Sequence, residues 1–161
     1  MSGPKGGDSP DESRLFGSLY SELRAFAAVV GFATDDPDDL VQEALVRVLA
    51  GPGLSNLESP RAYMKKIVLN LAADRARGRV RRDRALTRLA PEAHLDHHPS
   101  DLALLDILSP HDRALLYLAD VEGYTLREAA DQLGLSHQAA RLRASRSRRL
   151  LKRRLDLEEK R

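Results

Sequence analysis

The apolar residues in the first part of the chain recur at the spacing of an α-helix. The earliest segment carries five of them on one helical face: Leu15, Leu19, Leu23, Phe26 and Val30. Residues three and four positions apart lie on the same side of a helix, and a glycine commonly ends one. The pattern therefore predicts a first helix that ends near Gly31.

Two further helices are predicted from their start signals. Asp36 before Pro37, and Ser59 before Pro60, each combine a capping side chain with a proline, which is favoured at the first helical position. The second helix has the apolar stripe Leu40, Val41, Ala44, Leu45 and Val48. It stops at residues 51–53, and the third helix carries Met64, Ile67, Val68 and Leu71 before an arginine-rich stretch.

The C-terminal part of the chain predicts three more helices. Ser109 and Pro110 repeat the start signal, and the helix that follows has the apolar side Ala114, Leu115, Leu118 and Val121, with Gly123 at its end. Thr125 and Glu128 have the spacing of a capping box, which starts a helix that ends at Gly134. Ser136 caps a last helix that reaches at least Leu155.

The helical patterns predict an all-α fold of two small helical domains, and the composition between them predicts a flexible linker. Residues 1–12 lack apolar periodicity and are expected to be disordered. Residues 89–100 are polar and contain prolines, which is typical of a linker. The predicted domains are residues 13–88 and residues 101–157, the latter a helix-turn-helix.

Composition also excludes several classes of protein. The chain has no cysteine and 4% aromatic residues, which excludes a thiol enzyme and disfavours a β-sandwich. No apolar run is long enough for a membrane span or a signal peptide, so we expect a cytoplasmic protein without membrane insertion. No motif of a catalytic site is present, and we predict neither an enzyme nor a cofactor.

Three histidines in the predicted linker, His94, His97 and His98, have a spacing that can hold a metal ion. No cysteine accompanies them, and only a few carboxylates lie nearby. A solvated polar turn is the better interpretation, and we predict no metal site.

Charge is strongly segregated along the chain, although the net charge is only +2. Residues 1–60 sum to −6 and residues 61–90 to +8, while residues 91–140 sum to −7 and residues 141–161 to +7. Two basic blocks that each follow an acidic segment predict two separate sites for a polyanion.

The last helix has the faces of a DNA-recognition helix. A step of 100° per residue places the small residues Ala140, Ala144 and Ser147 on one side with Leu151. The opposite side collects Gln138, Arg141, Leu142, Ser145, Arg146 and Arg149. These side chains suit base edges, a thymine methyl group and phosphates in the major groove. A merely solvated basic helix is disfavoured, because eight basic residues and no acid lie between Arg141 and Arg154.

The third helix has a polar side that combines a ring, an amide and cations: Tyr63, Lys66, Asn70, Arg77 and Arg81. Stacking rings and positive charge are what unpaired DNA strands need. Considered alone, this helix fits half-buried packing and solvation better than a nucleic-acid site.

The second helix starts with acidic and amide groups: Asp38, Asp39, Gln42 and Glu43. Compensation of the helix dipole explains its first acids, and contact with a protein partner is the alternative.

Together, these segments resemble an extracytoplasmic-function (ECF) bacterial sigma factor, from Leu15 to Leu155. The segment DDLVQEALVRVL resembles the family's polymerase-docking helix, SPRAYMKKIVLNLAADRAR its −10 segment, and LSPHDRALLYLADVEGYTLREAADQLGLSHQAARLRASRSRRLLK its −35-reading region. The resemblance implies a transcription initiation factor that binds core RNA polymerase, through the β′ clamp helices and the β flap, and promoter DNA. An anti-sigma factor is a further partner that the family suggests.

The resemblance also implies roles for individual residues. Contacts to core polymerase fall to Asp39, Leu40, Gln42 and Glu43. The residues implied to act at the −10 element are Tyr63, Lys66 and Asn70, and the loop 54–58 is implied to surround a flipped base. The residues implied to read the major groove of the −35 element are Arg141, Leu142, Ser145 and Arg146. The chain departs from the family in Tyr63, where tryptophan is usual, in Leu142, where a small polar residue is usual, and in Ala140 and Ala144, where larger aliphatic residues are common.

Two other functions remain open from the sequence. A sigma-like mimic would sequester an anti-sigma factor without binding promoters, but it has no need of groove-facing arginines. A stand-alone helix-turn-helix regulator would bind duplex DNA by itself, but this leaves the first domain unexplained.

Overall fold

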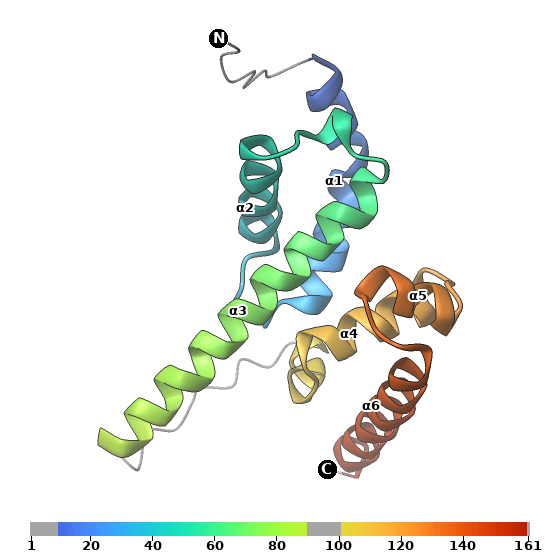
Figure 1. The fold of residues 1–161 in the computed structure, drawn as a ribbon. Helices are drawn as coiled ribbons and strands as arrows, with labels where there is room; N and C mark the ends of the chain where they lie inside the picture. Colours follow the sequence, from blue (N-terminus) through green and yellow to red (C-terminus); the bar gives the residue numbers. More distant parts are fainter. Residues whose placement is uncertain (1–9, 90–100, 161) are drawn as a thin grey trace.

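The computed structural model describes residues 10–89 and 101–160, and these residues form helices and turns without a strand (Figure 1). The all-α prediction is confirmed. The α-helices are α1 (Pro10–Val30), α2 (Pro37–Ala50), α3 (Pro60–Leu89), α4 (Pro110–Leu116), α5 (Leu126–Leu133) and α6 (His137–Glu158). Short 3₁₀ turns occupy Leu54–Asn56 (η1) and Asp101–Ile107 (η2), and a π turn occupies Tyr117–Val121 (η3).

Four of the predicted helix starts are present as side-chain caps, at Asp36, Ser109, Thr125 and Ser136. Asp36 accepts a hydrogen bond from the backbone N–H of Asp38 at 2.9 Å, and Ser109 and Ser136 cap α4 and α6 in the same way. Thr125 and Glu128 form the complete capping box of α5. Each cap satisfies backbone donors that a helix start leaves unpaired, so the chain direction changes at these positions.

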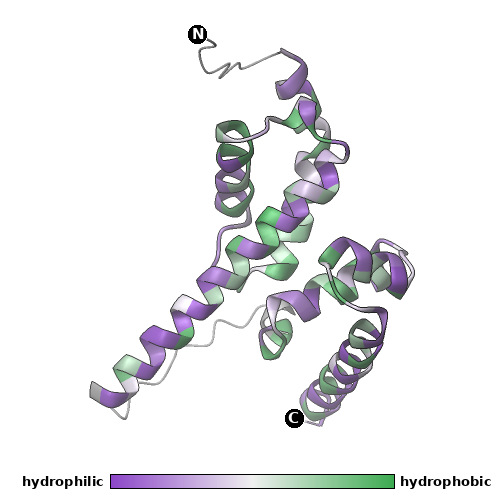
Figure 2. Cartoon of the chain, in the orientation of Figure 1, coloured by the Kyte–Doolittle hydropathy of each residue, from purple (hydrophilic) through white to green (hydrophobic). Residues whose placement is uncertain are grey.

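Helices α1, α2 and α3 form the first lobe. Their apolar faces meet in one core whose fully buried members include Leu23, Phe26, Val41, Met64 and Val68. Figure 2 shows hydrophobic residues on the facing sides of these helices and a mostly hydrophilic outer half of α3. The hydrophobic periodicity of the sequence therefore identified this core correctly.

Helix α1 starts earlier than the sequence suggested. Residues 1–12 were expected to be disordered, but the helix begins at Pro10, with Asp11 and Glu12 in its first turn. Proline is favoured at a helix start, and acidic residues there interact well with the helix dipole. Glu12 also accepts a hydrogen bond from the backbone N–H of Ser55 at 3.4 Å, a contact between distant parts of the sequence that periodicity does not reveal.

Helices α4, α5 and α6, with η2 and η3, form the second lobe. Its core is built from leucines of α4 and η3 and from small residues of α5 and α6, among them Leu115, Leu118, Ala129 and Ala140. Gly134 joins α5 to α6 with a φ of 67°, a left-handed conformation that glycine adopts without a steric penalty. This is the predicted helix-turn-helix.

The prediction for the end of the α4 segment was wrong in one respect. Val121 was expected on the apolar side, but it is 68% exposed. From Tyr117 the chain forms a π turn, in which the N–H of Glu122 bonds to the carbonyl of Tyr117 at 3.0 Å. The wider turn rotates the following side chains relative to an α-helix, so the helical spacing used for Val121 does not apply.

The two lobes pack against each other through α4, which contacts both α1 and α3. Ala114 of α4 is fully buried in the core of the first lobe. The rings of Phe26 and Tyr117 meet edge to face, with 5.7 Å between their centroids. Residues 90–100 of the predicted linker, 89–100, lie outside the described residues, whereas Leu89 belongs to α3. The contact between the lobes was not anticipated from the sequence.

Arg113 of α4 is the central polar residue of this contact. It is 2% exposed, and its guanidinium donates to the backbone carbonyls of Leu108 and Gly31. Its Nη2 lies 3.3 Å from Oδ1 of Asp106. A side chain at Gly31 would approach the carbonyl oxygen of Ala27 to 2.9 Å, so the α1 carbonyl that receives Arg113 sits where only glycine fits.

Lys65 of α3 makes the second buried polar contact between the lobes. The side chain is 5% exposed, and its Nζ lies 2.6 Å from a carboxylate oxygen of Glu22 in α1 and 2.6 Å from one of Glu122 in the second lobe. A buried ammonium group requires such pairing because an unpaired buried charge is very costly. Lys65 therefore favours the packed arrangement of the lobes.

We expect the substitution Arg113→Ala to separate the lobes while the helices remain. The loss of a buried charged partner should remove about 3–5 kcal/mol from the free energy that holds the lobes together. Because the chain has no cysteine, single cysteines at Gln42 and Arg153 can be labelled for energy transfer. Transfer should fall in the variant and stay unchanged in the control Arg127→Ala, which removes an exposed arginine. Unchanged transfer in Arg113→Ala would contradict this role.

Candidate nucleic-acid interface

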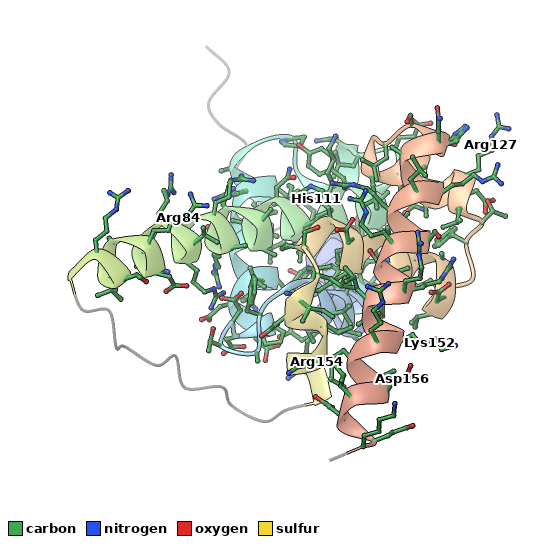
Figure 3. The ribbon with its side chains drawn as sticks, turned by 90° about the horizontal axis from the view of Figure 1, so that it is seen from below. Arg84, His111, Arg127, Lys152, Arg154 and Asp156 are labelled. Atoms are coloured by element: carbon green, nitrogen blue, oxygen red, sulfur yellow. The ribbon has the colours of Figure 1, made fainter. Side chains whose placement is uncertain are left out.

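Helix α6 separates a packing side from an outward side as predicted. Ala140, Ala144 and Ser147 are buried, and Leu151 is partly buried against the same core. The six predicted −35 residues are all exposed: Gln138, Arg141, Leu142, Ser145, Arg146 and Arg149. Figure 3 shows the basic side chains of this helix, such as Lys152, projecting from the molecule. A groove of duplex DNA can reach the outward side without a change in the second lobe.

Among the arginines of α6 outside the predicted set, two pair with acids elsewhere in the second lobe. Arg148 donates to the carboxylate of Asp120 in η3, with a shortest distance of 2.6 Å. Nε of Arg143 lies 3.6 Å from Oδ1 of Asp112 in α4. These pairs fix the angle of α6 on its lobe. The sequence did not distinguish them from the outward-facing arginines except by their position on the helix.

Helix α3 presents the predicted polar stripe on its exposed side. Tyr63 is 39% exposed, and Lys66, Asn70, Arg77 and Arg81 are exposed as well. The stripe is therefore accessible along several turns of the helix. The alternative of half-buried packing fits Tyr63 in part, whereas the remaining four side chains have no role in the core.

Other arginines of α3 serve the first lobe. Arg79 pairs with Asp35 at 2.7 Å, and Arg75 pairs with Glu43 at 3.0 Å, so both bind the α2 side. The guanidinium carbon of Arg79 also lies 4.4 Å from the ring centroid of Phe32. The arginine-rich stretch thus divides into residues that hold the lobe together and residues that face outward.

A groove of about 510 Å³ lies between the outward side of α3 and the start of α4. Most of its lining is apolar, with Ala73 and Val80 among the residues, and its polar groups come from Ser109, His111 and three arginines: Arg77, Arg81 and Arg84. Figure 3 labels Arg84 on the outer half of α3 and His111 of α4 in the second lobe. The predicted −10 arginines therefore lie at the contact between the two lobes.

The acidic surface of α2 is smaller than predicted. Asp39 and Gln42 are exposed, and Glu43 is half-buried between Arg47 and Arg75, each at 3.0 Å. Leu40, in contrast, is fully buried in the core, so its predicted contact with a partner is wrong. The position of Leu40 in the apolar stripe of the helix indicates burial, whereas the family resemblance implies an exposed contact.

Asp38 is bound to α1, since the Tyr20 hydroxyl and Arg24 of that helix donate to its carboxylate. The hydrogen bond from Tyr20, followed by that from Arg24, lowers the pKa of Asp38.

Exposed apolar residues on α2 were missed. Val46 is 64% exposed and Leu49 is 42% exposed, both on the same helix as Asp39 and Gln42. In the loop before α3, Leu54 is buried whereas Ser55 and Asn56 are exposed. Leu54 thus anchors the predicted base-binding loop, and the polar residues of that loop face solvent.

Comparisons with known proteins agree with this arrangement. Residues 15–82 match the family Sigma-70 region 2, and residues 102–151 match the family Sigma-70, region 4. The chain is 30% identical over 130 residues to the ECF RNA polymerase sigma factor SigE of Mycolicibacterium smegmatis, over 73% of this chain and 51% of that protein. It is 24% identical over 153 residues to the ECF RNA polymerase sigma factor SigM of Mycobacterium tuberculosis, over 91% of this chain and 78% of that protein.

The chain belongs to the ECF sigma factors. It spans about half the length of SigE. The fold of this sigma factor resembles that of the sigma factor RpoE in its complex with the anti-sigma factor NepR from Bartonella quintana, with a TM-score of 0.67 at 23% identity, covering 91% of this chain and 97% of that one. It also resembles CnrH in complex with the cytosolic domain of CnrY, with a TM-score of 0.62 at 26% identity, covering 94% and 91% of the two chains.

In the described part of this sigma factor, none of the helices is long and apolar enough to cross a membrane, and no three acidic or histidine side chains gather as a metal site would require. The linker histidines His94, His97 and His98 lie outside the described residues.

The groove makes the stability of this ECF sigma factor depend on pH through His111. Burial and then the charges of Arg143 on α6 and Arg77 on α3 lower the pKa of His111, while Asp112 opposes them. The unfolded chain therefore binds a proton more readily than the folded chain, and acidification through the ordinary histidine pKa of about 6.5 should destabilise the fold.

We expect the free energy of unfolding to fall more between about pH 7.5 and about pH 5.5 in the wild type than in His111→Gln. Denaturant titration of both proteins at each pH measures the difference. Equal losses in the two proteins would show that His111 is as easily protonated in the fold as in the unfolded chain.

Proposed function

We propose that this ECF sigma factor binds core RNA polymerase and directs it to promoters, where α6 recognises the −35 element and α3 binds the melted −10 element. One observation carries the proposal: a single chain presents two outward-facing basic surfaces, of different chemistry, on two lobes. Two DNA contacts on one chain raise each other's effective concentration. The protein itself needs no catalytic residue, because the polymerase performs the chemistry.

The −35 contact uses the outward side of α6 in the major groove. Arg141 and Arg146 suit guanine edges, Gln138 suits adenine, and Leu142 provides apolar contact for a thymine methyl group. Ser145 and Arg149 add a hydroxyl donor and a phosphate contact. Leu142 stands where the family usually has a small polar residue, so the preferred −35 sequence should differ from that of typical members.

The −10 contact uses the exposed stripe of α3 on a single strand. Tyr63 stacks on an unpaired base, Asn70 hydrogen-bonds to base edges, and Lys66 neutralises phosphate. Arg77 and Arg81 extend the positive charge along the strand. Ser55 and Asn56, held in place by buried Leu54, surround a base that has left the stack.

Core polymerase binds the surface of α2. Asp39, Gln42 and Glu43 supply acidic and amide groups, and exposed Val46 and Leu49 supply the apolar contact that a stable interface needs. This surface fits the β′ clamp helices, and the second lobe contacts the β flap. The polymerase then sets the spacing between the two DNA-binding helices in the cytoplasm of a bacterium.

Run-off transcription followed by sequencing, with purified core polymerase and genomic template, tests the proposal. New start sites should appear only when the chain is added, and the sequences upstream should share −35 and −10 elements. Absence of any new start site would refute the proposal.

The two other functions give different results in electrophoretic shifts. A stand-alone regulator shifts promoter DNA without polymerase, a sigma-like mimic never shifts it, and a sigma factor shifts it mainly with polymerase. We infer that an anti-sigma factor regulates this chain. The similar RpoE was solved in complex with the anti-sigma factor NepR, and the similar CnrH in complex with the cytosolic domain of CnrY.

The substitution Arg141→Ala should cost about 1–3 kcal/mol at one −35 base pair and relax the preference there. Binding of holoenzyme to promoters that differ at single −35 positions measures the effect. Arg153→Ala removes an arginine that is exposed on the same helix but outside the predicted set, and it should leave the preference unchanged. An equal loss on every promoter would identify Arg141 as a phosphate contact.

The substitution Asn70→Ala should leave binding to the −35 element intact and reduce formation of the open complex. The amide is exposed on α3 and has no part in the core, so its loss should not disturb the fold. Permanganate reactivity of thymines in the −10 region measures melting. Unchanged reactivity would remove Asn70 from the site.

A further inference from the structure

The outer half of α3 projects beyond the first lobe (Figure 1). The helix has 30 residues, and its last turns contribute little to either core: Val80 is 49% exposed and Leu86 is 51% exposed. Packing of an apolar face supplies most of the stability of a protein helix. The turns after Arg79 have almost none, so the core of the first lobe does not explain why the helix continues to Leu89.

Four arginines on this part of α3 lie along one line. Arg77, Arg81, Arg84 and Arg88 are separated by four, three and four residues, which keeps them on one side of a helix. The same side carries Lys66 and Asn70 further toward the start of α3. At 1.5 Å per residue, the distance along the axis from Arg77 to Arg88 is about 16 Å, close to the rise of five base pairs of DNA.

Most of these arginines have no acidic partner. Arg75 and Arg79, on the opposite side of α3, form ion pairs with the first lobe. Within the described residues, Arg81, Arg84 and Arg88 form none, and all three are exposed. Like charges four residues apart, as in Arg84 and Arg88, destabilise a free helix. A bound polyanion relieves this repulsion.

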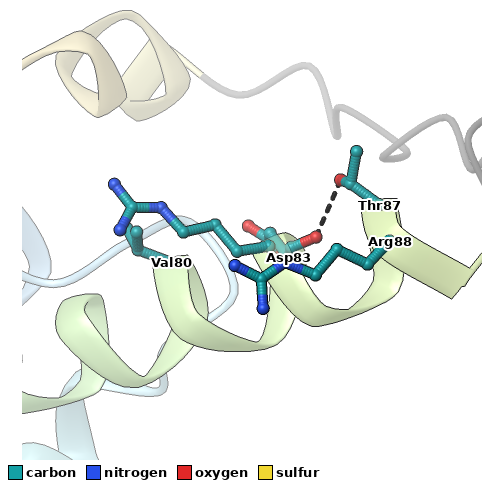
Figure 4. Close-up of a pocket in the computed structure, with 5 residues that line it drawn as sticks. Val80, Asp83, Thr87 and Arg88 are labelled. Atoms are coloured by element: carbon teal, nitrogen blue, oxygen red, sulfur yellow. Dashed lines mark hydrogen bonds between the residues drawn. The ribbon is translucent and has the colours of Figure 1, made fainter.

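A shallow hollow of about 430 Å³ lies between two of the arginines (Figure 4). Its sides are Arg84 and Arg88, and its floor includes Val80 and Thr87, with Asp83 as its acidic group. The Thr87 hydroxyl donates to the backbone carbonyl of Asp83 at 2.8 Å and is turned away from a ligand. The donors that remain for a ligand are the two guanidinium groups, which match phosphate geometry.

We propose that Arg84 and Arg88, which continue the line of Arg77 and Arg81 beyond the −10 strand, bind backbone phosphates of the duplex DNA between the two promoter elements. This inference rests on the proposed function. Residues 76–89 contain no aromatic side chain, and stacking on rings is the main way that proteins hold unpaired bases. The aromatic and amide groups lie in the first half of α3, so the helix passes from a base-binding half to a phosphate-binding half.

The test uses holoenzyme assembled from core polymerase and the full chain, with a promoter recovered by run-off transcription. Two fork-junction DNAs carry the same single-stranded −10 segment. In the long fork the upstream duplex extends through the −35 element, whereas in the short fork the duplex ends at the −10 edge. Fluorescence anisotropy over a range of salt concentrations gives the affinity and its salt dependence.

We expect Arg84→Ala and Arg88→Ala each to weaken binding of the long fork several-fold at low salt. Each should reduce the slope of log affinity against log salt by about 0.9, the value for one phosphate of duplex DNA. Binding of the short fork should not change. Alanine favours helix, so the projecting turns should persist, and circular dichroism checks this.

Arg82→Ala is the matched control, because Arg82 is exposed in the same stretch but about 130° away from the line around the helix. It should leave both forks unchanged. Equal losses on the long and short forks would overturn the duplex assignment and indicate single-strand contact. An equal loss of long-fork affinity in Arg82→Ala would show that the overall positive charge of the helix, rather than the line of arginines, attracts the DNA, and it would overturn the site. Failure of wild-type holoenzyme to bind either fork would instead refute the proposed function itself.

Discussion

The arrangement of the two lobes depends on the buried guanidinium of Arg113. A guanidinium keeps its charge in the protein interior, so each of its donors must find an acceptor or the fold incurs a large desolvation cost. The carbonyls that accept from it belong to both lobes, Leu108 in one and Gly31 in the other. A polar group thus specifies one orientation at a contact where apolar surfaces alone would tolerate several. Lys65, between Glu22 of α1 and Glu122 after the π turn, applies the same constraint at a second point of the contact.

Local features of the fold could be predicted from the sequence, because they depend on neighbouring residues. The caps at Asp36, Ser109 and Thr125, and the buried face of α6, all follow from side chains within one or two helical turns. The exposed α3 stripe and the outward side of α6 were predicted by the same rule. For Leu40, the family resemblance implied a contact with polymerase, whereas its place in the apolar stripe of α2 correctly indicated that it lies in the core.

The contact between the lobes could not be predicted in this way. Lys65 bonds to Glu122, 57 residues away, and Arg113 bonds to Gly31, 82 residues away. A charged residue is usually solvated, and no local pattern distinguishes the rare one whose partners lie on another lobe. The arginines of α3 and α6 present the same difficulty on the surface. Arg79 and Arg148 hold helices in place while their neighbours face outward, and only the position of distant acids separates the two groups.

The π turn limits how this part of the chain can change during evolution. Asp120 in the turn pairs with Arg148 of α6, and Glu122 directly after the turn pairs with Lys65 of α3. Insertion or deletion of a single residue between Arg113 and Thr125 would turn one of these carboxylates away from its partner, even if every amino acid identity were kept. The length of this segment is therefore constrained as strongly as its composition, and related chains should vary here by substitution more readily than by changes in length.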